Sequence, residues 1–132
     1  MKLPNAKLPN AKNTPMSERP RELEERTALF AEEVRAFVRT LPRTLSNVED
    51  VKQLVRASGS VAANCIEADE ALGNQDRLMH FRISRKEAKE CQLWLRLLYT
   101  GEDPDIQKQR SSLRQEAHEL KLIFTAIIKK LE

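Results

Sequence analysis

Aromatic residues and glycine are scarce in this chain of 132 residues, which has 5% aromatic side chains and three glycines. Sheet-rich domains depend on β-branched and aromatic residues and on glycine-rich turns. The chain is built instead from Ala, Leu, Glu, Lys and Arg, which are strong helix formers, and 33% of its residues are charged. The composition therefore predicts an all-α fold, at a length typical of one domain.

Cysteine is rare and long apolar runs are missing. Cys65 and Cys91 are the two cysteines, and they form neither a C-x-x-C motif nor a disulfide framework, so we expect reduced thiols. The apolar run LIFTAII (122–128) is far shorter than the roughly 20 residues that span a bilayer, and the N-terminus has no apolar signal-peptide segment. These absences predict a cytoplasmic protein that does not associate with a membrane.

Ligand sets for the common protein metals are missing too. A di-iron site in a helical bundle needs Glu-x-x-His on two helices. Here Arg77 stands three positions before His80, and Gln115 stands three positions before His118. Two histidines without clustered cysteines also make a poor zinc site. The sequence therefore predicts no metal and no cofactor.

Catalytic motifs give no better match. Cys91 lies about three helical turns from His80, too far for the histidine to activate its thiol. Each glycine stands alone, so no glycine-rich loop can hold a phosphate. We therefore expect that the protein is not an enzyme, and we interpret both cysteines as buried structural residues.

The first 15 residues differ from the rest of the chain. KLPNA occurs twice in tandem (2–6 and 7–11), three prolines fall by position 15, and no apolar periodicity is present. Such a segment buries too little apolar surface to offset its ordering entropy, which predicts a disordered tail over 1–15. Two interpretations stay open: translation begins at Met1 and retains this tail, or it begins at Met16.

Four helical segments follow over 16–132, with apolar residues recurring at steps of three and four. The spacing predicts helices over 17–41, 46–72, 74–99 and 103–131. The expected helix starts and stops are Ser17 with Pro20, Pro42, Ser46 with Glu49 as a capping box, Gly73, Asn74, and Asp103 with Pro104. Short connections and an average step of 3.5 residues predict an antiparallel up-down-up-down left-handed four-helix bundle.

The predicted helix 74–99 is apolar over more than half of its circumference, whereas one bundle core needs a stripe of little more than ~100°. Met79, Ile83, Trp94 and Leu97 form a second apolar strip, which favours an oligomer interface between copies of the chain. The alternative is a helix that is central in a compact monomer. Beside this strip we expect a structural polar network of Asn64, Glu67, Glu87 and Glu90, because a buried carboxylate needs a partner.

The same helix carries basic residues. Residues 73–100 hold six Lys/Arg and three Asp/Glu, whereas residues 46–72 hold two and five. This bias favours a local basic face, although the mild net charge of +3 does not indicate a strongly basic nucleic-acid binder, and a solvated charged face is the alternative. The candidate residues are Arg82, Arg85, Lys86, Lys89 and Arg96, with Arg35, Arg39 and Arg43 as possible additions.

Two stretches carry a family resemblance: QLVRASGSVAANCIEADEAL (53–72) and KEAKECQLWLRLL (86–98). They resemble the bacterial four-helix-bundle proteins encoded by intervening sequences of 23S ribosomal RNA genes, over about residues 20–131. The chain departs at Cys65, where an aromatic residue is common, and at Asn74, where Ser often caps. The matching positions are Arg56, Ser58, Ser60, Val61, Ala63, Asn64, Glu67, Ala68, Lys86, Glu87, Glu90, Trp94 and Leu95.

The resemblance implies assembly more than activity. Members of the family form up-down-up-down bundles that associate into homopentamers, and no enzymatic function is established for them. A related branch, the accessory protein of diversity-generating retroelements, implies binding to nucleic acid and to a reverse transcriptase. We therefore expect a homo-oligomeric scaffold that binds nucleic acid or a ribonucleoprotein. The alternative is a protein-protein interaction module without a nucleic-acid role.

Overall fold

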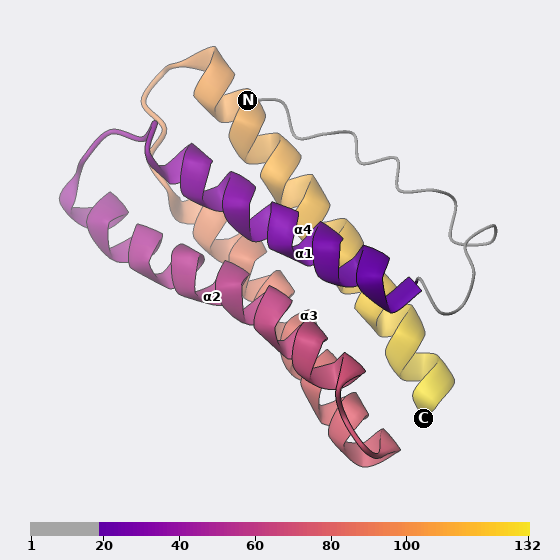
Figure 1. Ribbon diagram of the computed structural model, residues 1–132. Helices are drawn as coiled ribbons and strands as arrows, with labels where there is room; N and C mark the ends of the chain where they lie inside the picture. Colours follow the sequence, from indigo (N-terminus) through magenta and orange to yellow (C-terminus); the bar gives the residue numbers. More distant parts are fainter. Residues whose placement is uncertain (1–18) are drawn as a thin grey trace.

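A computed structural model describes residues 19–132, with side chains from Glu22 onward, and these residues form four helices and no strand (Figure 1). The predicted tail and the choice between Met1 and Met16 lie outside the described residues. The helices are α1 (Arg19–Val38), α2 (Leu45–Asp69), α3 (Asn74–Leu97) and α4 (Pro104–Leu131). The all-α prediction with four helices is confirmed.

The connections between helices alternate between the two ends of the molecule. The α1–α2 and α3–α4 connections lie at one end, and the α2–α3 connection lies at the other (Figure 1). Asn47 joins the two connections that share an end. Its Nδ2 donates to Pro42 O and to Tyr99 O, both at 2.8 Å, and its Oδ1 accepts from Tyr99 N at 2.9 Å. This buried side chain therefore satisfies three backbone groups that no helix satisfies.

The core lies along the axis of the bundle and receives side chains from every helix. The largest buried side chains are aromatic and branched, and the rings of Phe81 and Phe124 pack with centroids 6.1 Å apart. Burial of one such side chain contributes roughly 1.5–3 kcal/mol. The core side chains of largest volume are Phe30, Phe37, Phe124, Leu54, Leu95, Leu113, Leu120 and Ile128.

The starts of α2 and α3 correct the predicted caps. Thr44 caps α2, because its backbone is extended and its Oγ1 accepts from Asn47 N at 3.1 Å. Ser46 lies inside the first turn and is exposed, so the capping box predicted at Ser46 is wrong. Gly73 occupies the cap position of α3 without a side-chain bond, and Asn74 is already helical. The cap at Asp103 is confirmed by its bonds to the amides of the first turn of α4.

Three helix ends also differ from the prediction. α1 ends at Val38, three residues before the predicted end at Leu41. α2 ends at Asp69 with Glu70 as its C-cap, so Gly73 does not terminate it. α3 ends at Leu97, and Leu98 turns to an extended backbone. The chain then reverses through Gly101, whose φ of 67° lies in the left-handed region that glycine adopts without steric cost.

Candidate interaction surface on α2 and α3

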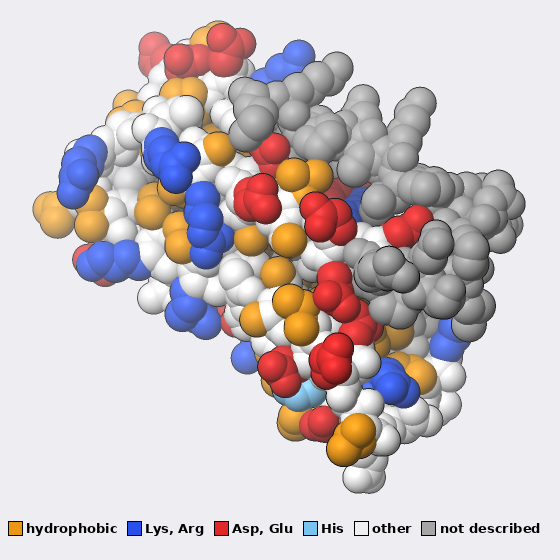
Figure 2. All heavy atoms as spheres, viewed as in Figure 1, with side chains coloured by type: hydrophobic (Ala, Val, Ile, Leu, Met, Phe, Trp, Pro, Cys, Tyr) orange, Lys and Arg blue, Asp and Glu red, His pale blue; other side chains and the backbone are white. Residues whose placement is uncertain are grey.

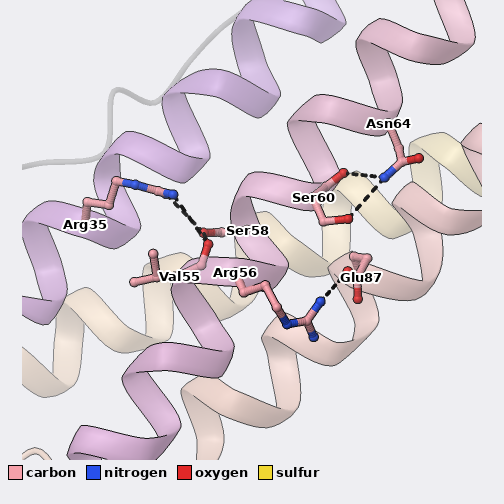
Figure 3. Close-up of polar contacts among 7 residues, drawn as sticks. All are labelled: Arg35, Val55, Arg56, Ser58, Ser60, Asn64 and Glu87. Carbon is pink, nitrogen blue, oxygen red and sulfur yellow. Dashed lines mark hydrogen bonds and ion pairs between the residues drawn. The ribbon is translucent and has the colours of Figure 1, made fainter.

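An ion pair crosses from α2 to α3 near the middle of both helices. Arg56 Nη1 lies 3.2 Å from Glu87 Oε2, as Figure 3 shows. The two side chains are unequally buried, with 57% of the Arg56 side chain exposed and 5% of the Glu87 side chain. Glu87 therefore has its cationic partner within the same chain, on the neighbouring helix.

A second polar group lies further along the same two helices. Asn64 Nδ2 donates to Ser60 O at 3.0 Å and lies 3.1 Å from Ser60 Oγ (Figure 3). Its Oδ1 faces His80 Nδ1 at 2.9 Å. Asn64 Nδ2 donates to the carbonyl of Ser60, so Asn64 Oδ1 is the atom that faces His80. Because an amide oxygen only accepts, His80 Nδ1 carries the proton and donates it. His80 Nε2 lies 3.6 Å from Asp76 Oδ1, which extends the chain of polar groups to the start of α3.

The predicted four-residue network is thus divided. Asn64 and Glu87 belong to separate groups of bonds, while Glu67 is exposed and Glu90 is half-buried. Within residues 22–132, neither Glu67 nor Glu90 makes a hydrogen bond or an ion pair. Sequence reasoning did not identify Arg56 or His80 as partners, because their contacts depend on the register between α2 and α3.

Arg35 of α1 lies against a stretch of α2 that carries small residues, Ala57, Ser58, Gly59 and Ser60. Arg35 Nη1 donates to Ser58 Oγ at 3.4 Å, and Nη2 donates to Val55 O at 3.5 Å (Figure 3). Nη1 also donates to Ala31 O at 2.9 Å. A Cβ at Gly59 would stand 3.3 Å from Nη2. The small residues therefore allow the Arg35 guanidinium to lie close against the backbone of α2. This contact directs Arg35 onto α2 and away from the other basic candidates.

The apolar strip on α3, defined as Met79, Ile83, Trp94 and Leu97, remains partly uncovered by the chain. Met79 is 47% exposed and Leu97 is 51% exposed, whereas Ile83 and Trp94 are half-buried. Trp94 packs against the core cluster, and its Nε1 is buried without a hydrogen-bond acceptor among the described residues. Unpaired Glu90 occupies the same side of α3, at helical spacing from Met79 and Leu97.

Other exposed apolar side chains extend this surface toward one end of the bundle. Leu93 is 45% exposed and precedes Leu97 by one turn, and Tyr99 is 55% exposed just beyond the helix. Leu45 is 90% exposed at the start of α2, which Asn47 ties to Tyr99. The sequence pattern missed Leu45 and Tyr99 as parts of this surface, because they lie outside the predicted apolar stripes.

The basic candidates separate into groups. Arg82, Lys89 and Arg96 are exposed and recur every seven residues, so they share one side of α3. Arg82 pairs with Glu132 of α4 at 3.1 Å. Lys86 is also exposed but falls closer to the apolar strip, and Arg85 is half-buried. Arg39 and Arg43 are exposed near the α1–α2 connection, away from the middle of α3.

Charge is divided between the two halves of the bundle. α1 and α2 together carry six Lys/Arg and nine Asp/Glu, whereas α3 and α4 carry twelve and six. Figure 2 shows the carboxylates gathered along the face that α1 and α2 present. The net charges of −3 and +6 follow from these counts, and they give the molecule an acidic and a basic side.

Two carboxyl groups face each other between α1 and α2. Burial, chiefly, and a hydrogen bond shared with Glu24 raise the pKa of Asp69 from 3.8 to about 7, while Arg77 opposes the shift. Asp69 Oδ2 is buried, and no N–H or hydroxyl donor of the described residues reaches it. Two carboxylates can share a hydrogen bond only when one carries a proton. The pair therefore favours a protonated Asp69.

Both thiols are buried and unreactive in this fold. Burial raises the pKa of Cys65 to about 12, and burial also raises the pKa of the Cys91 thiol strongly. Neither supplies a thiolate at neutral pH. Across residues 22–132, no group of three or more His, Cys, Asp or Glu is arranged to hold a metal ion. None of the helices in this part of the chain is long and apolar enough to cross a membrane.

Comparison with known proteins identifies the family. The model of the 23S rRNA-intervening sequence protein family matches residues 22–126, which is most of the chain. The chain belongs to this family. The family's fold is shared by a crystal structure at 1.70 Å resolution from Bacteroides thetaiotaomicron, described as a protein of unknown function from the S23 ribosomal protein family. That structure matches with a TM-score of 0.71 and 26% identity, covering 83% of this chain and 97% of that chain. No curated protein matches.

Proposed function

We propose that this intervening-sequence protein is a non-enzymatic, cytoplasmic, homo-oligomeric scaffold that assembles through the apolar strip on α3. Each copy is an up-down-up-down left-handed bundle, and the family resemblance favours a ring of five. The observation that carries the proposal is the uncovered apolar surface of α3, with Met79 at 47% and Leu97 at 51% exposure beside a half-buried Trp94. Contiguous apolar surface rimmed by polar residues is typical of protein–protein interfaces, and Trp is enriched at their anchors.

A second copy is the favoured occupant because the surface is continuous. It follows α3 from Met79 through Ile83 to Leu97 and then reaches Tyr99 and Leu45 at the end of the bundle. The Arg56–Glu87 pair lies at the edge of the strip, whereas Glu90 lies among its apolar residues. The unpaired Glu90 carboxylate can accept hydrogen bonds from a neighbouring copy.

Two leucines with the same exposure test this proposal. Leu97 in the strip and Leu122 on the outer side of α4 are each 51% exposed. Leu97→Glu places a charge in the proposed interface, and Leu122→Glu places it outside. Light scattering is expected to give the wild type and Leu122→Glu a multiple of 15.2 kDa, five times this mass for a ring of five. Leu97→Glu is expected to be a folded monomer. A monomeric wild type, or equal masses for both variants, overturns the proposal.

We further propose that the basic side of the scaffold binds nucleic acid. The net charge of +6 on α3 and α4 supports this function, because phosphate contacts by Lys and Arg dominate nucleic-acid affinity. A partner protein, such as a reverse transcriptase, is the alternative that the resemblance also implies. Purification from the native cell distinguishes them. Complexes that survive nuclease treatment indicate a protein partner, whereas loss of the complex with nuclease indicates nucleic acid.

A further inference from the structure

The basic residues of α3 face a second basic row on α4. Two contacts fix how α3 and α4 lie against each other: Arg110 Nη1 donates to Leu98 O at 2.6 Å, and Arg82 pairs with Glu132 at 3.1 Å. Between these contacts, Lys89 and Arg96 of α3 lie at the same levels as Lys121 and Arg114 of α4. We call these four residues the basic seam.

The positions on α4 follow from its helical repeat. Arg110 and Glu132 both reach α3, so the side of α4 on which they lie faces α3. Arg114 follows Arg110 by four residues and Lys121 follows Arg114 by seven, which keeps both near that side. The sequence alone could not assign them to the same surface as Lys89 and Arg96, because the register between two helices is a tertiary property.

Three carboxylates in the middle of α3 and α4 are directed to other helices. Glu87 pairs with Arg56 of α2, whereas Glu116 and Glu119 approach Arg26 of α1, with Glu116 Oε1 at 2.7 Å from Nη2. Within residues 22–132, none of Lys89, Arg96, Arg114 and Lys121 has an ion-pair partner. The cations of the seam therefore form a row whose charge is not neutralised within the chain.

The four charged side chains of the seam favour some classes of partner over others. Interfaces between protein copies are depleted in Lys and need an apolar centre, which the four charged positions do not supply. Binding to single strands uses exposed aromatic rings that stack on bases. The aromatic residues of α3 and α4 lie elsewhere: Phe81 and Phe124 are buried together in the core, and Trp94 belongs to the apolar strip.

We infer that the basic seam binds the phosphate backbone of double-stranded nucleic acid without reading its sequence. This inference rests on the proposed nucleic-acid function and names its surface and ligand. From Lys89 to Arg96 the unpaired cations of α3 extend about 10 Å along the helix. A copy that places its four seam cations on phosphates neutralises about four charges of the duplex, so log affinity falls with log salt at a slope of about −3.6 per copy. Several copies in one assembly bind the same duplex more tightly than one.

Two double variants with equal charge change test the inference. Lys89→Gln with Lys121→Gln removes one cation from each row of the seam. Lys52→Gln with Lys130→Gln is the control, because Lys52 pairs with Glu49 on α2 and Lys130 lies outside the seam on α4. The probes are 20-base-pair duplexes of RNA and DNA with scrambled sequences, and single strands of the same length. Fluorescence anisotropy from 50 to 200 mM salt gives the affinity, and light scattering gives the mass.

The seam variant is expected to bind both duplexes roughly 10-fold or more weakly at low salt, with a log–log salt slope smaller by about 2. The control variant is expected to bind as tightly as the wild type, and all three proteins are expected to have the same mass.

Equal binding by both variants overturns the assignment to the seam, while the proposal of nucleic-acid binding stands. Tighter binding to single strands overturns the assignment to duplexes. A lower mass for the seam variant alone makes the seam a contact between copies. No duplex binding by the wild type at 50 mM salt overturns both proposals.

Discussion

The two halves of the bundle share a core but differ in how they use charge. Between α1 and α2, charged groups are turned inward: Arg35 lies on the backbone of α2, and Asp69 faces Glu24. Between α3 and α4, the cations Lys89 and Arg96 face outward, and the nearby carboxylates are directed to other helices. The difference is the reason that both proposed interaction surfaces, the apolar strip and the basic seam, include residues of α3.

The largest expected loss of stability comes from removing the Asn47 side chain, which links the α1–α2 connection to the α3–α4 connection. Asn47→Ala removes three hydrogen bonds at a site that is 2% exposed, which leaves Tyr99 O and Tyr99 N without partners and Pro42 O with the amide of Thr44 alone. We expect a loss of about 3–5 kcal/mol in the free energy of unfolding, from a penalty of ~1–3 kcal/mol per unsatisfied buried group that water partly relieves. Urea denaturation measures this loss. A loss below about 1 kcal/mol would show that the two connections hold together without Asn47.

A smaller effect is expected where α2 meets α3. Arg56→Ala leaves the buried Glu87 carboxylate without its cation, and we expect a loss of about 2 kcal/mol, below the ~3–5 kcal/mol of fully buried pairs because Arg56 is half exposed. Glu87→Gln leaves an arginine that water can solvate, so this matched variant is expected to lose less. Thermal unfolding of both variants ranks the two losses. The reverse order would contradict the unequal burial of the pair.

The Asp69–Glu24 pair between α1 and α2 predicts that the stability of the protein depends on pH. The pKa of Asp69 is raised from 3.8 to about 7 in the folded protein, chiefly by burial, so the folded state binds a proton that the unfolded state releases. Stability therefore falls as pH rises from about 4 to about 7 and levels off above that. Asp69→Asn is expected to remove this slope and to be more stable than the wild type at pH 8. Urea midpoints from pH 4 to pH 8 check both expectations, and an unchanged slope in Asp69→Asn would exclude this pair as its source.

The smallest effect concerns the close approach of α1 to α2. Gly59→Ala gains up to about 1 kcal/mol of helix propensity. Its Cβ would stand 3.3 Å from Arg35 Nη2, the end of a flexible side chain that can shift by a few tenths of an ångström. We expect a net stabilisation of about 0.5 kcal/mol, measured by thermal unfolding. A destabilised Gly59→Ala would mean that the position of Arg35 against α2 is rigid.

Local pattern was sufficient to predict the helices and much of the core. Steps of three and four placed Phe30, Phe37 and Phe124 inside, and Asp103 before a proline predicted a cap that the structure confirms. The cap of α2 was missed because Thr44 and Ser46 are both capping residues and stand two positions apart. Local sequence gives little basis for choosing between two hydroxyl side chains that can both accept the same kind of bond.

The site depends on contacts between distant positions, which local pattern does not contain. Asn47 bonds to Tyr99 across 52 positions, and Arg56 meets Glu87 across 31. The predicted basic face included Lys89 and Arg96 but omitted their neighbours on α4, since those depend on the register of α3 against α4. Apolar periodicity did find the strip on α3, because excess apolar width is a property of one helix.

Quenching of Trp94 fluorescence by acrylamide tests most directly whether the strip on α3 is covered. Trp94 is the sole tryptophan, and Met79 lies fifteen residues away, about 22 Å along the helix, so Met79→Glu cannot alter its surroundings by direct contact. If copies cover the strip, Met79→Glu separates them and Trp94 is quenched more strongly than in the wild type at the same micromolar concentration. Identical quenching in both proteins would show that no second copy lies on the strip.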